Sequence, residues 1–339
     1  MIARRARSGF ASAAKAVLHC AGFATRLEAA PFQSERHKAI SHRPLLRCFA
    51  SGLLSISLLS CEGPRTNRVV IGSKNFTESL VLGELIAQEI EAHTQMKVER
   101  RFYLAGTYIC HQGMLAGRLD IYPEYTGTAL TAILKENPER DRGKAYEQMK
   151  AEYEKRFRLS LGPSFGFNDT FAMEIRGDDA RRLKLKTLSE SAAYASQWRA
   201  GFGYEFMERP DGFHGLAAAY GLHFATPPRI MDLGLLARSL KDHQIDLAAG
   251  NTTDGLIPAL DLFVLEDDKH YFPPYDAVAV VRDDALARHP EVGEALAAFA
   301  GKISDREMQQ LNYAVDGEKR DVRDVAREFL QKKALIAPQ

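Results

Sequence analysis

The stretch RVVIGSKNFTESLVLGELIAQEIEAH, from Arg68 to His93, decides the fold. Its first residues are mostly apolar and predict a buried strand over 68–72, which a polar loop follows. From Thr77 to His93 apolar side chains recur at helical spacing, and the Thr77 hydroxyl is expected to cap the helix. The apolar face of this helix consists of Leu80, Leu82, Leu85, Ile86 and Ile90. The first unit of the fold is therefore a strand followed by an amphipathic helix.

The same alternation of strands and helices continues along the chain. A second strand is expected over 97–103, a helix from 106 to about 116, and a third strand over 119–122. Strand–helix–strand repeats of this length imply right-handed βαβ units and a parallel sheet. Further strands are expected over 170–175, 199–203, 245–249 and 277–282, and further helices over 145–156, 235–241 and between 290 and 331. The fold class is thus α/β.

Two segments predict that the chain crosses between two lobes. GFNDTFAMEIR at 166–176 and YFPPYDAVAVVR at 271–282 each join a polar stretch to an apolar strand, as a hinge strand that lines a cleft does. A chain of 339 residues has room for two domains. We expect one lobe of residues 66–168 plus 275–339, a second lobe of residues 169–274, and a ligand cleft between them.

The first 65 residues differ in composition from the rest. Arg43 and Arg47 precede an apolar run of 13 residues from Cys48 to Ser60, and Cys61 follows it. This pattern describes a secretory signal and not a transmembrane span. The context Leu-Leu-Ser before Cys61 resembles the lipobox of bacterial lipoproteins, in which that Cys becomes the lipidated first residue. The alternative is an uncleaved apolar segment, and residues 1–42 are either an over-extended start or a second targeting element.

Composition and motifs exclude several functional classes. The 45 basic and 44 acidic residues nearly balance, so no nucleic-acid partner is expected. The sequence has no P-loop, GxSxG, HExxH or GxGxxG motif, and its histidines lack partners at metal-ligand spacing. Cys110 is the one cysteine after the signal and is expected in the core. We predict no catalytic residue, cofactor or metal; a hydrolase that uses Asp120, Glu124 or Asp254 is the enzymatic alternative.

Three tyrosines predict a binding site for an organic cation. Tyr125, Tyr204 and Tyr275 lie in loop-like settings beside Gly, Pro, Thr or Asp and not on a periodic apolar face. Aromatic side chains are usually placed in the core, where they bury most area. On loops, their ring faces are free to surround a quaternary ammonium group. The alternative for each single tyrosine is core packing with a hydrogen-bonded hydroxyl.

Polar residues recur near these tyrosines, at the ends of predicted strands and the start of a helix. Lys74 and Asn75 follow the first strand, where loops of α/β proteins present ligand contacts. Thr107 begins a helix, where free N–H groups favour an anion such as a carboxylate. Asn251, Thr252 and Asp254 follow a later strand in the same way. A cation cage combined with such turns suits a zwitterion that has a methylated ammonium.

Seven segments carry a resemblance to a known family. In chain order they are GSKNFTES, LAGT, GRLDIYPEYTGTAL, FGFNDTFAM, YEFMERPDGFHGLAAAYGL, TTDGLI and DDKHYFPPYDAVAVVR. Together they resemble the substrate-binding proteins of ABC importers for glycine betaine, choline and related osmoprotectants, over residues 66–339. The resemblance implies a type II periplasmic-binding-protein fold, no catalytic activity, and delivery of the solute to a membrane permease.

The resemblance differs in strength from one position to another. Tyr125 and Tyr275 match family tyrosines, and Thr107 falls in a loop where the family contacts its ligand. Tyr204 stands in GFGYEF, where the family is closer to GAEHEF. The helix after Met231-Asp232 has leucines where the family often has a tyrosine, so one wall of the cage is missing or replaced.

The sequence therefore predicts an exported, lipid-anchored and monomeric binding protein for a quaternary ammonium compound. Glycine betaine, choline, carnitine and proline betaine are the candidate ligands. The alternative is a binding protein for a different small solute on the same fold.

Overall fold

A computed structural model describes residues 67–338 of the chain. The predicted signal, including the apolar run of residues 48–60 and Cys61, lies outside the described residues. Within residues 67–338, no helix is both long enough and apolar enough to cross a membrane.

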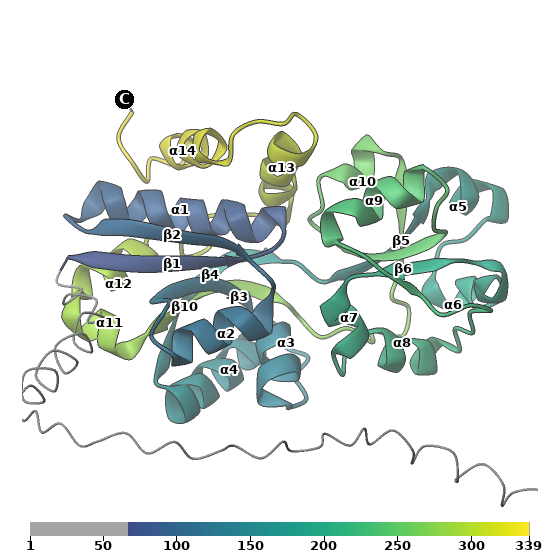
Figure 1. The fold of residues 1–339 in the computed structure, drawn as a ribbon, viewed down its shortest axis with the longest axis horizontal. Helices are drawn as coiled ribbons and strands as arrows, with labels where there is room; N and C mark the ends of the chain where they lie inside the picture. The colour runs from purple at the N-terminus through teal and green to yellow at the C-terminus, as the bar shows by residue number, and fades with distance from the viewer. Residues whose placement is uncertain (1–66, 339) are drawn as a thin grey trace, which may run out of the picture. The chain divides into compact units, whose positions relative to one another are not determined.

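The described chain forms two mixed five-stranded sheets (Figure 1). The first has the order β2-β1-β3-β10-β4. Its strands are β1 (Arg68–Lys74), β2 (Lys97–Leu104), β3 (Ile121–Tyr125), β4 (Leu159–Asn168) and β10 (Asp276–Arg282). We call this sheet and the helices on it lobe 1.

The second sheet has the order β7-β6-β8-β5-β9. Its strands are β5 (Phe171–Arg176), β6 (Ala200–Phe202), β7 (Arg229–Ile230), β8 (Leu247–Asn251) and β9 (Leu262–Leu265). We call this sheet and its helices lobe 2. The chain passes between the sheets at 169–170 and again at 266–275. The boundaries at 168/169 and 274/275 stay a prediction.

The expected parallel sheet is correct only in part. β1 pairs in parallel with β2 and β3, and β6 pairs in parallel with β7 and β8. β10 and β5 are antiparallel to both of their neighbours. The cause is the double crossing, because a strand that leaves a lobe and a strand that returns to it run in opposite directions. β4 and β9, which the sequence pattern did not predict, complete this arrangement.

Helices cover both faces of each sheet (Figure 1). Those of lobe 1 are α1 (Thr77–His93), α2 (Thr107–Leu115), α3 (Thr126–Thr128), the π-helix η1 (Ala129–Leu134), α4 (Arg142–Phe157), α11 (Asp283–Arg288), α12 (Pro290–Ala297), α13 (Asp305–Asp316) and α14 (Val322–Lys332). Those of lobe 2 are α5 (Gly177–Leu183), α6 (Leu188–Ser191), the 3₁₀ helix η2 (Ala195–Gln197), α7 (Tyr204–Glu208), α8 (Phe213–Tyr220), α9 (Leu233–Lys241) and α10 (Leu256–Ala259).

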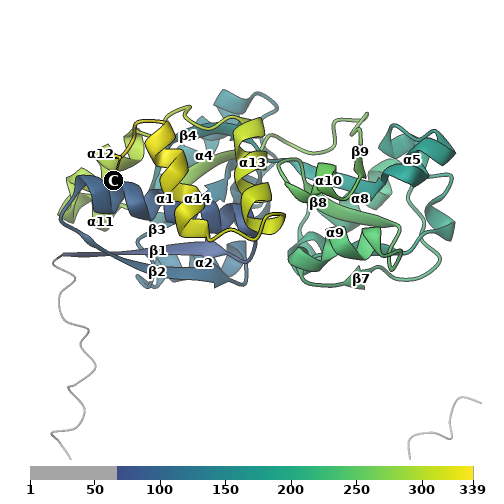
Figure 2. The same ribbon diagram turned by 90° about the horizontal axis from the view of Figure 1, so that it is seen from above.

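Helix α1 has the predicted bounds but not the predicted cap. Phe76 is the capping residue, and no side chain caps it. The Thr77 hydroxyl instead donates to Asp316 Oδ1 at 2.7 Å. This bond ties α1 to α13, which lies at the end of lobe 1 next to lobe 2, while α14 packs on α1 (Figure 2).

The hydrophobic core is continuous through the crossings. Phe167 before the first crossing, Met173 after it and Tyr275 at the second belong to one buried cluster. Cys110 is buried and free, as expected for a core residue. The two lobes are therefore joined by packed side chains as well as by the chain itself.

Candidate functional site

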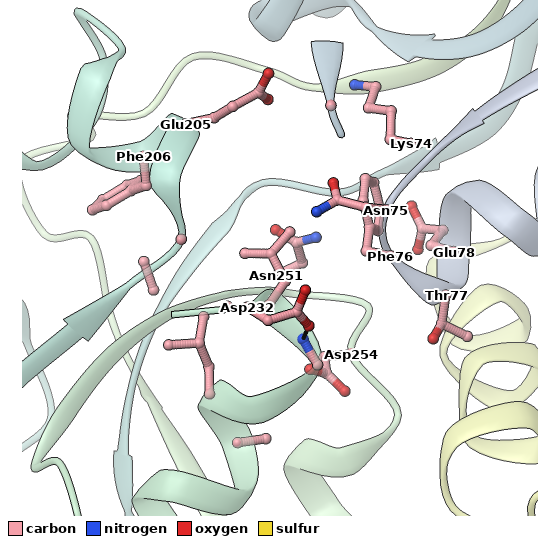
Figure 3. Close-up of a pocket in the computed structure, with 18 of the residues that line it drawn as sticks. Lys74, Asn75, Phe76, Thr77, Glu78, Glu205, Phe206, Asp232, Asn251 and Asp254 are labelled. Atoms are coloured by element: carbon pink, nitrogen blue, oxygen red, sulfur yellow. Dashed lines mark hydrogen bonds between the residues drawn. The ribbon is translucent and has the colours of Figure 1, made fainter. Parts of the chain in front are cut away.

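A cavity of about 780 Å³ lies between the two lobes (Figure 3). Lobe 1 contributes the ends of β1, β2 and β3 and the starts of α1 and α2, together with α13. Lobe 2 contributes the start of β5, the end of β8 and the starts of α7 and α9. Strand ends and helix starts meet there, as at ligand sites of other open α/β sheets.

Most of the predicted site residues line this cavity. Asn75 and Asn251 approach its middle from opposite lobes (Figure 3). Thr252 is not among the lining residues, whereas its neighbour Thr253 is. The other predicted residues in the lining are Lys74, Thr107, Tyr125, Tyr204, Asp254 and Tyr275.

Tyr125 is not in a loop, because it ends strand β3 and is only 4% exposed. Its hydroxyl donates to Glu78 Oε1 at 2.7 Å, and its ring stacks on Phe76 with 6.3 Å between centroids. Lys74 Nζ lies 4.8 Å from the ring centroid and forms an ion pair with the buried Glu124. The ring that we expected to receive a ligand cation thus already has a cation of the chain beside it.

Tyr275 has the same kind of surroundings. It is 2% exposed, and its hydroxyl donates to Asp211. The guanidinium of Arg209 lies 5.8 Å from the Tyr275 ring centroid and 4.9 Å from that of Phe171. Arg209 also forms a buried ion pair with Asp211. Burial, with the nearby Asp211 carboxylate, holds the pKa of Tyr275 well above 10.

Other rings stand at the mouth of the cavity. Tyr204, the first residue of α7, is 64% exposed. Tyr103 near the end of β2 is 55% exposed and has a left-handed backbone, with φ of 61°. Ile230 and Leu233 of lobe 2 are exposed lining residues as well. Tyr103 was not predicted as a site residue, because the sequence does not show its left-handed backbone; such strained positions at strand ends occur at binding sites.

The position of the absent family tyrosine is filled by aliphatic side chains. Leu235 is exposed and does not line the cavity, whereas Leu233 and Leu236 do. On this side the cavity therefore has an apolar wall without an aromatic ring from α9.

A buried carboxyl pair connects the lobes at the back of the cavity. The Thr253 hydroxyl lies within hydrogen-bond distance of Glu78 Oε2 and of Asp169 Oδ1, the latter at 2.7 Å. One hydroxyl has one hydrogen to donate, so one of the two carboxyls must carry its own proton. Burial raises the pKa of both carboxyls, and the charge of Glu78 raises that of Asp169 further. Asn312 of α13 also donates to Glu78 Oε2, at 2.9 Å.

The lining is rich in acidic side chains. Seven carboxyl and four basic side chains line the cavity. The carboxyls are Glu78, Asp169, Glu174, Glu205, Asp232, Asp254 and Asp316, and the basic residues are Lys74, Arg209, Arg238 and Lys319. The buried Lys74 and Arg209 are both paired with carboxylates that are not part of the lining. The lining therefore favours a cationic ligand.

Besides Glu78 and Asp169, two more of these carboxyls have pKa values that burial raises. Glu174 is 1% exposed, and its Oε1 has no hydrogen-bond partner among the described residues. Burial raises the pKa of Glu174, and the charges of Asp254 and Asp169 add to the rise. Burial also raises the pKa of Asp254 to about 6.

The carboxylates of the hydrolase alternative have structural partners. Asp120 Oδ2 accepts from the backbone N–H of Val70 at 2.9 Å, which joins β1 to the residue before β3. Glu124 is paired with Lys74, and neither acid lines the cavity. Asp254 caps the turn before α10 through the Leu256 N–H at 2.8 Å. These three carboxylates do not converge on one reacting position.

Comparison with known proteins gives consistent matches. The model for the substrate-binding domain of ABC-type glycine betaine transport systems matches residues 67–332. The carnitine transport binding protein OpuCC of Listeria monocytogenes is 39% identical over 284 residues, which are 83% of this chain and 91% of that protein. The ergothioneine transport permease/ergothioneine binding protein EgtU of Helicobacter pylori is 36% identical over 79% of this chain and 48% of its own length.

A solved structure agrees with these matches. A crystal structure described as a glycine betaine/carnitine/choline ABC transporter is 36% identical, with a TM-score of 0.65. The match covers 79% of this chain and 99% of that one.

Proposed function

The chain belongs to the family of substrate-binding domains of ABC-type glycine betaine transport systems, and from this we propose that it binds a quaternary ammonium compound in the cavity between its lobes. It has the type II periplasmic-binding-protein fold of such proteins, and it is a transport component and not an enzyme. It acts outside the cytoplasm and passes its ligand to a membrane permease. Glycine betaine, choline, carnitine and proline betaine are the candidate ligands.

One observation carries the proposal of a cationic ligand. Aromatic rings from both lobes and an excess of carboxyl side chains line the same cavity. A cation without N–H groups, such as a methylated ammonium, is stabilised by ring faces and by a negative field, and each ring contact contributes about 0.5–2 kcal/mol depending on desolvation.

We assign the ligand contacts by the chemistry of the lining. Tyr125, Tyr204 and Tyr275 would contact the methylated head with the parts of their rings that the chain leaves free. Thr107 and Asn251 would hold the polar tail, and Lys74, Asn75 and Asp254 would complete the enclosure. Thr252 does not line the cavity, so it would support the polar tail only through its backbone, which lies between the lining residues Asn251 and Thr253.

Calorimetric titration against a panel of ligands tests this function. The panel contains the four candidate ligands, with glycine and proline as their unmethylated counterparts. We expect saturable binding of at least one quaternary compound and none of the unmethylated ones, because the rings select a cation that lacks N–H donors. Binding of only unmethylated solutes would show that the same fold serves a different ligand.

We further propose that the protein is a monomer anchored by a lipid on Cys61 and has no nucleic-acid partner. Cys61→Ser removes the one acylation position that the sequence provides, so lipid labelling should stop and the protein should become soluble. Metabolic labelling with a fatty acid and fractionation of cells measure both effects. A Ser variant that still sediments fully with membranes would indicate an uncleaved apolar segment instead.

A further inference from the structure

One carboxyl of lobe 2 lines the cavity without a partner among the described residues. Glu174, on β5, directly follows FGFNDTFAM and lies outside the segments that carry the family resemblance. Its side chain is 1% exposed, and its Oε1 has no hydrogen-bond partner within residues 67–338. A Cβ at Gly250 of β8 would lie 2.1 Å from this oxygen, so only glycine leaves room for the carboxyl. A buried carboxyl without a partner is costly, which indicates that a ligand group completes it.

The charged groups around Glu174 do not neutralise it. The charges that act on its carboxyl are those of Asp254 and Asp169, and both are negative. Arg176, two residues further along the same face of β5, is held in ion pairs with two other aspartates. Arg238 of α9 lines the cavity but is exposed, where water screens its charge. The part of the chain that the structure describes therefore supplies no counter-charge for Glu174.

Glu174 lies on the side of the cavity where α9 has no aromatic ring. It pairs with Ala248 of β8 in the antiparallel register, so both side chains point to the same face of the sheet. Ala248 belongs to the buried cluster that contains Leu236 and Ala237 of α9, and these two residues also line the cavity. The carboxyl is thus placed beside the apolar wall that α9 forms.

The carboxyl also borders the aromatic part of the cavity. Burial, and then neighbouring acids, raise the pKa of Glu174 and of Tyr125, and Asp169 is among those acids for both. Asp169 therefore lies near the carboxyl and near the ring. Without a counter-charge, Glu174 favours its protonated form. An ammonium group between the Tyr125 ring and Glu174 supplies that counter-charge, and the proton then passes to solvent.

We propose that Glu174 is the counter-charge for the quaternary ammonium head, on the wall where α9 presents aliphatic side chains instead of a ring. The proposal rests on the proposed function and deepens it by naming a specificity-determining residue. The apolar wall contacts the methyl groups, and the carboxylate beside it attracts the charge at their centre. The cavity then selects a cation over a neutral molecule of the same shape.

Two pairs of probes separate the charge of the head from its shape. Choline and glycine betaine are each compared with a carbon isostere, which has a tert-butyl group in place of the trimethylammonium. Calorimetry at about pH 8, where deprotonation of Glu174 costs less than at lower pH, gives the ratio of dissociation constants within each pair. The proteins are the wild type, Glu174→Gln, Glu174→Met and Glu208→Gln. Glu208 in α7 is exposed and does not line the cavity, so it is the control.

We expect the wild type to bind the charged member of a pair more tightly, and Glu174→Gln to reduce this preference about tenfold. Glu174→Met should reduce it as much, while both variants bind the isostere as the wild type does. Glu208→Gln should keep the wild-type ratio. In urea without probes, Glu174→Met should unfold at a higher concentration than the wild type, because it removes a buried carboxyl that has no counter-charge.

The outcomes separate this proposal from the proposed function. An unchanged ratio in both Glu174 variants overturns the role of Glu174 while quaternary ammonium binding stands. Equal losses for the charged probe and its isostere overturn it too, because they assign Glu174 to the shape of the cavity and not to its charge. If no quaternary ammonium compound binds the wild type, the proposed function fails and this proposal fails with it.

Discussion

The inner and outer aromatic side chains of the cavity differ in what surrounds them. Tyr125 and Tyr275 are buried, their hydroxyls are bound to carboxylates, and a lysine or arginine lies beside each ring. Tyr103 and Tyr204 at the mouth are more than half exposed. The inner rings therefore contribute to stability as much as to ligand binding, whereas the outer rings are free to contact a ligand.

The largest expected effect comes from the inner cations. Arg209→Met leaves Asp211 buried without its counter-charge, so the free energy of unfolding should fall by about 3–5 kcal/mol. Arg238→Met at the exposed end of the lining is the control, with an expected change within about 0.5 kcal/mol. Urea denaturation measures both variants. Equal losses for the two variants would show that the Arg209–Asp211 ion pair stabilises the fold no more than the exposed Arg238 does.

A smaller effect concerns pH. The pKa of Asp254 is raised to about 6, so the folded protein binds a proton there more tightly than the unfolded chain does. This stabilisation is complete below the unfolded pKa of about 4 and is lost as pH rises through about 6. The wild type should therefore lose stability on the order of 1–2 kcal/mol between pH 4 and 6, and Asp254→Asn should not show this loss.

Asp232→Asn is the matched control for this experiment. Asp232 lines the mouth of the same cavity and caps α9 through the Gly234 N–H, a bond that Asn can also make. Denaturation curves at several pH values should show a changed pH slope for the Asp254 variant alone. An unchanged slope in that variant would mean that Asp254 titrates as an exposed carboxyl does.

The smallest effect concerns the outer rings. Tyr204→Ala should weaken binding of choline by roughly two- to fivefold, since a cation–π contact at an exposed site contributes about 0.5–1 kcal/mol. Tyr204→Phe keeps the ring face and should bind as the wild type does. Both should unfold at the wild-type urea concentration. Loss of affinity in the Phe variant would assign the contact to the hydroxyl and not to the ring.

Much of the fold was predictable from local pattern. The helix over 77–93 has the predicted bounds because its apolar spacing is regular and a polar loop precedes it. The late strand over 276–282 was also predicted, because it is a continuous apolar run. β4 escaped prediction because glycine, proline and serine interrupt its apolar residues. The antiparallel pairing of β10 depends on the path of the chain between lobes, which no local pattern records.

The site was predictable in its location but not in its internal contacts. Strand ends pointed to Lys74, Asn75 and Asn251, which line the cavity. The ion pairs that neutralise Lys74 and Arg209 could not be predicted. Lys74 and its partner Glu124 are 50 residues apart in sequence, so only tertiary packing brings them together. Arg209 and Asp211 are close in sequence, but their burial beside the Tyr275 ring is also set by tertiary packing. These contacts set the chemistry of the cavity.

The single buried cysteine of the described chain has a practical consequence. Burial raises the pKa of the Cys110 thiol to about 12, so it is almost entirely protonated at neutral pH and shielded from reagents. Cysteines introduced at exposed positions of a protein that begins after Cys61 would therefore react with maleimide dyes without a competing thiol. A donor dye on α4 and an acceptor dye on α5 would then report, by energy transfer between them, whether the distance between the lobes changes when ligand binds, with no background substitution needed.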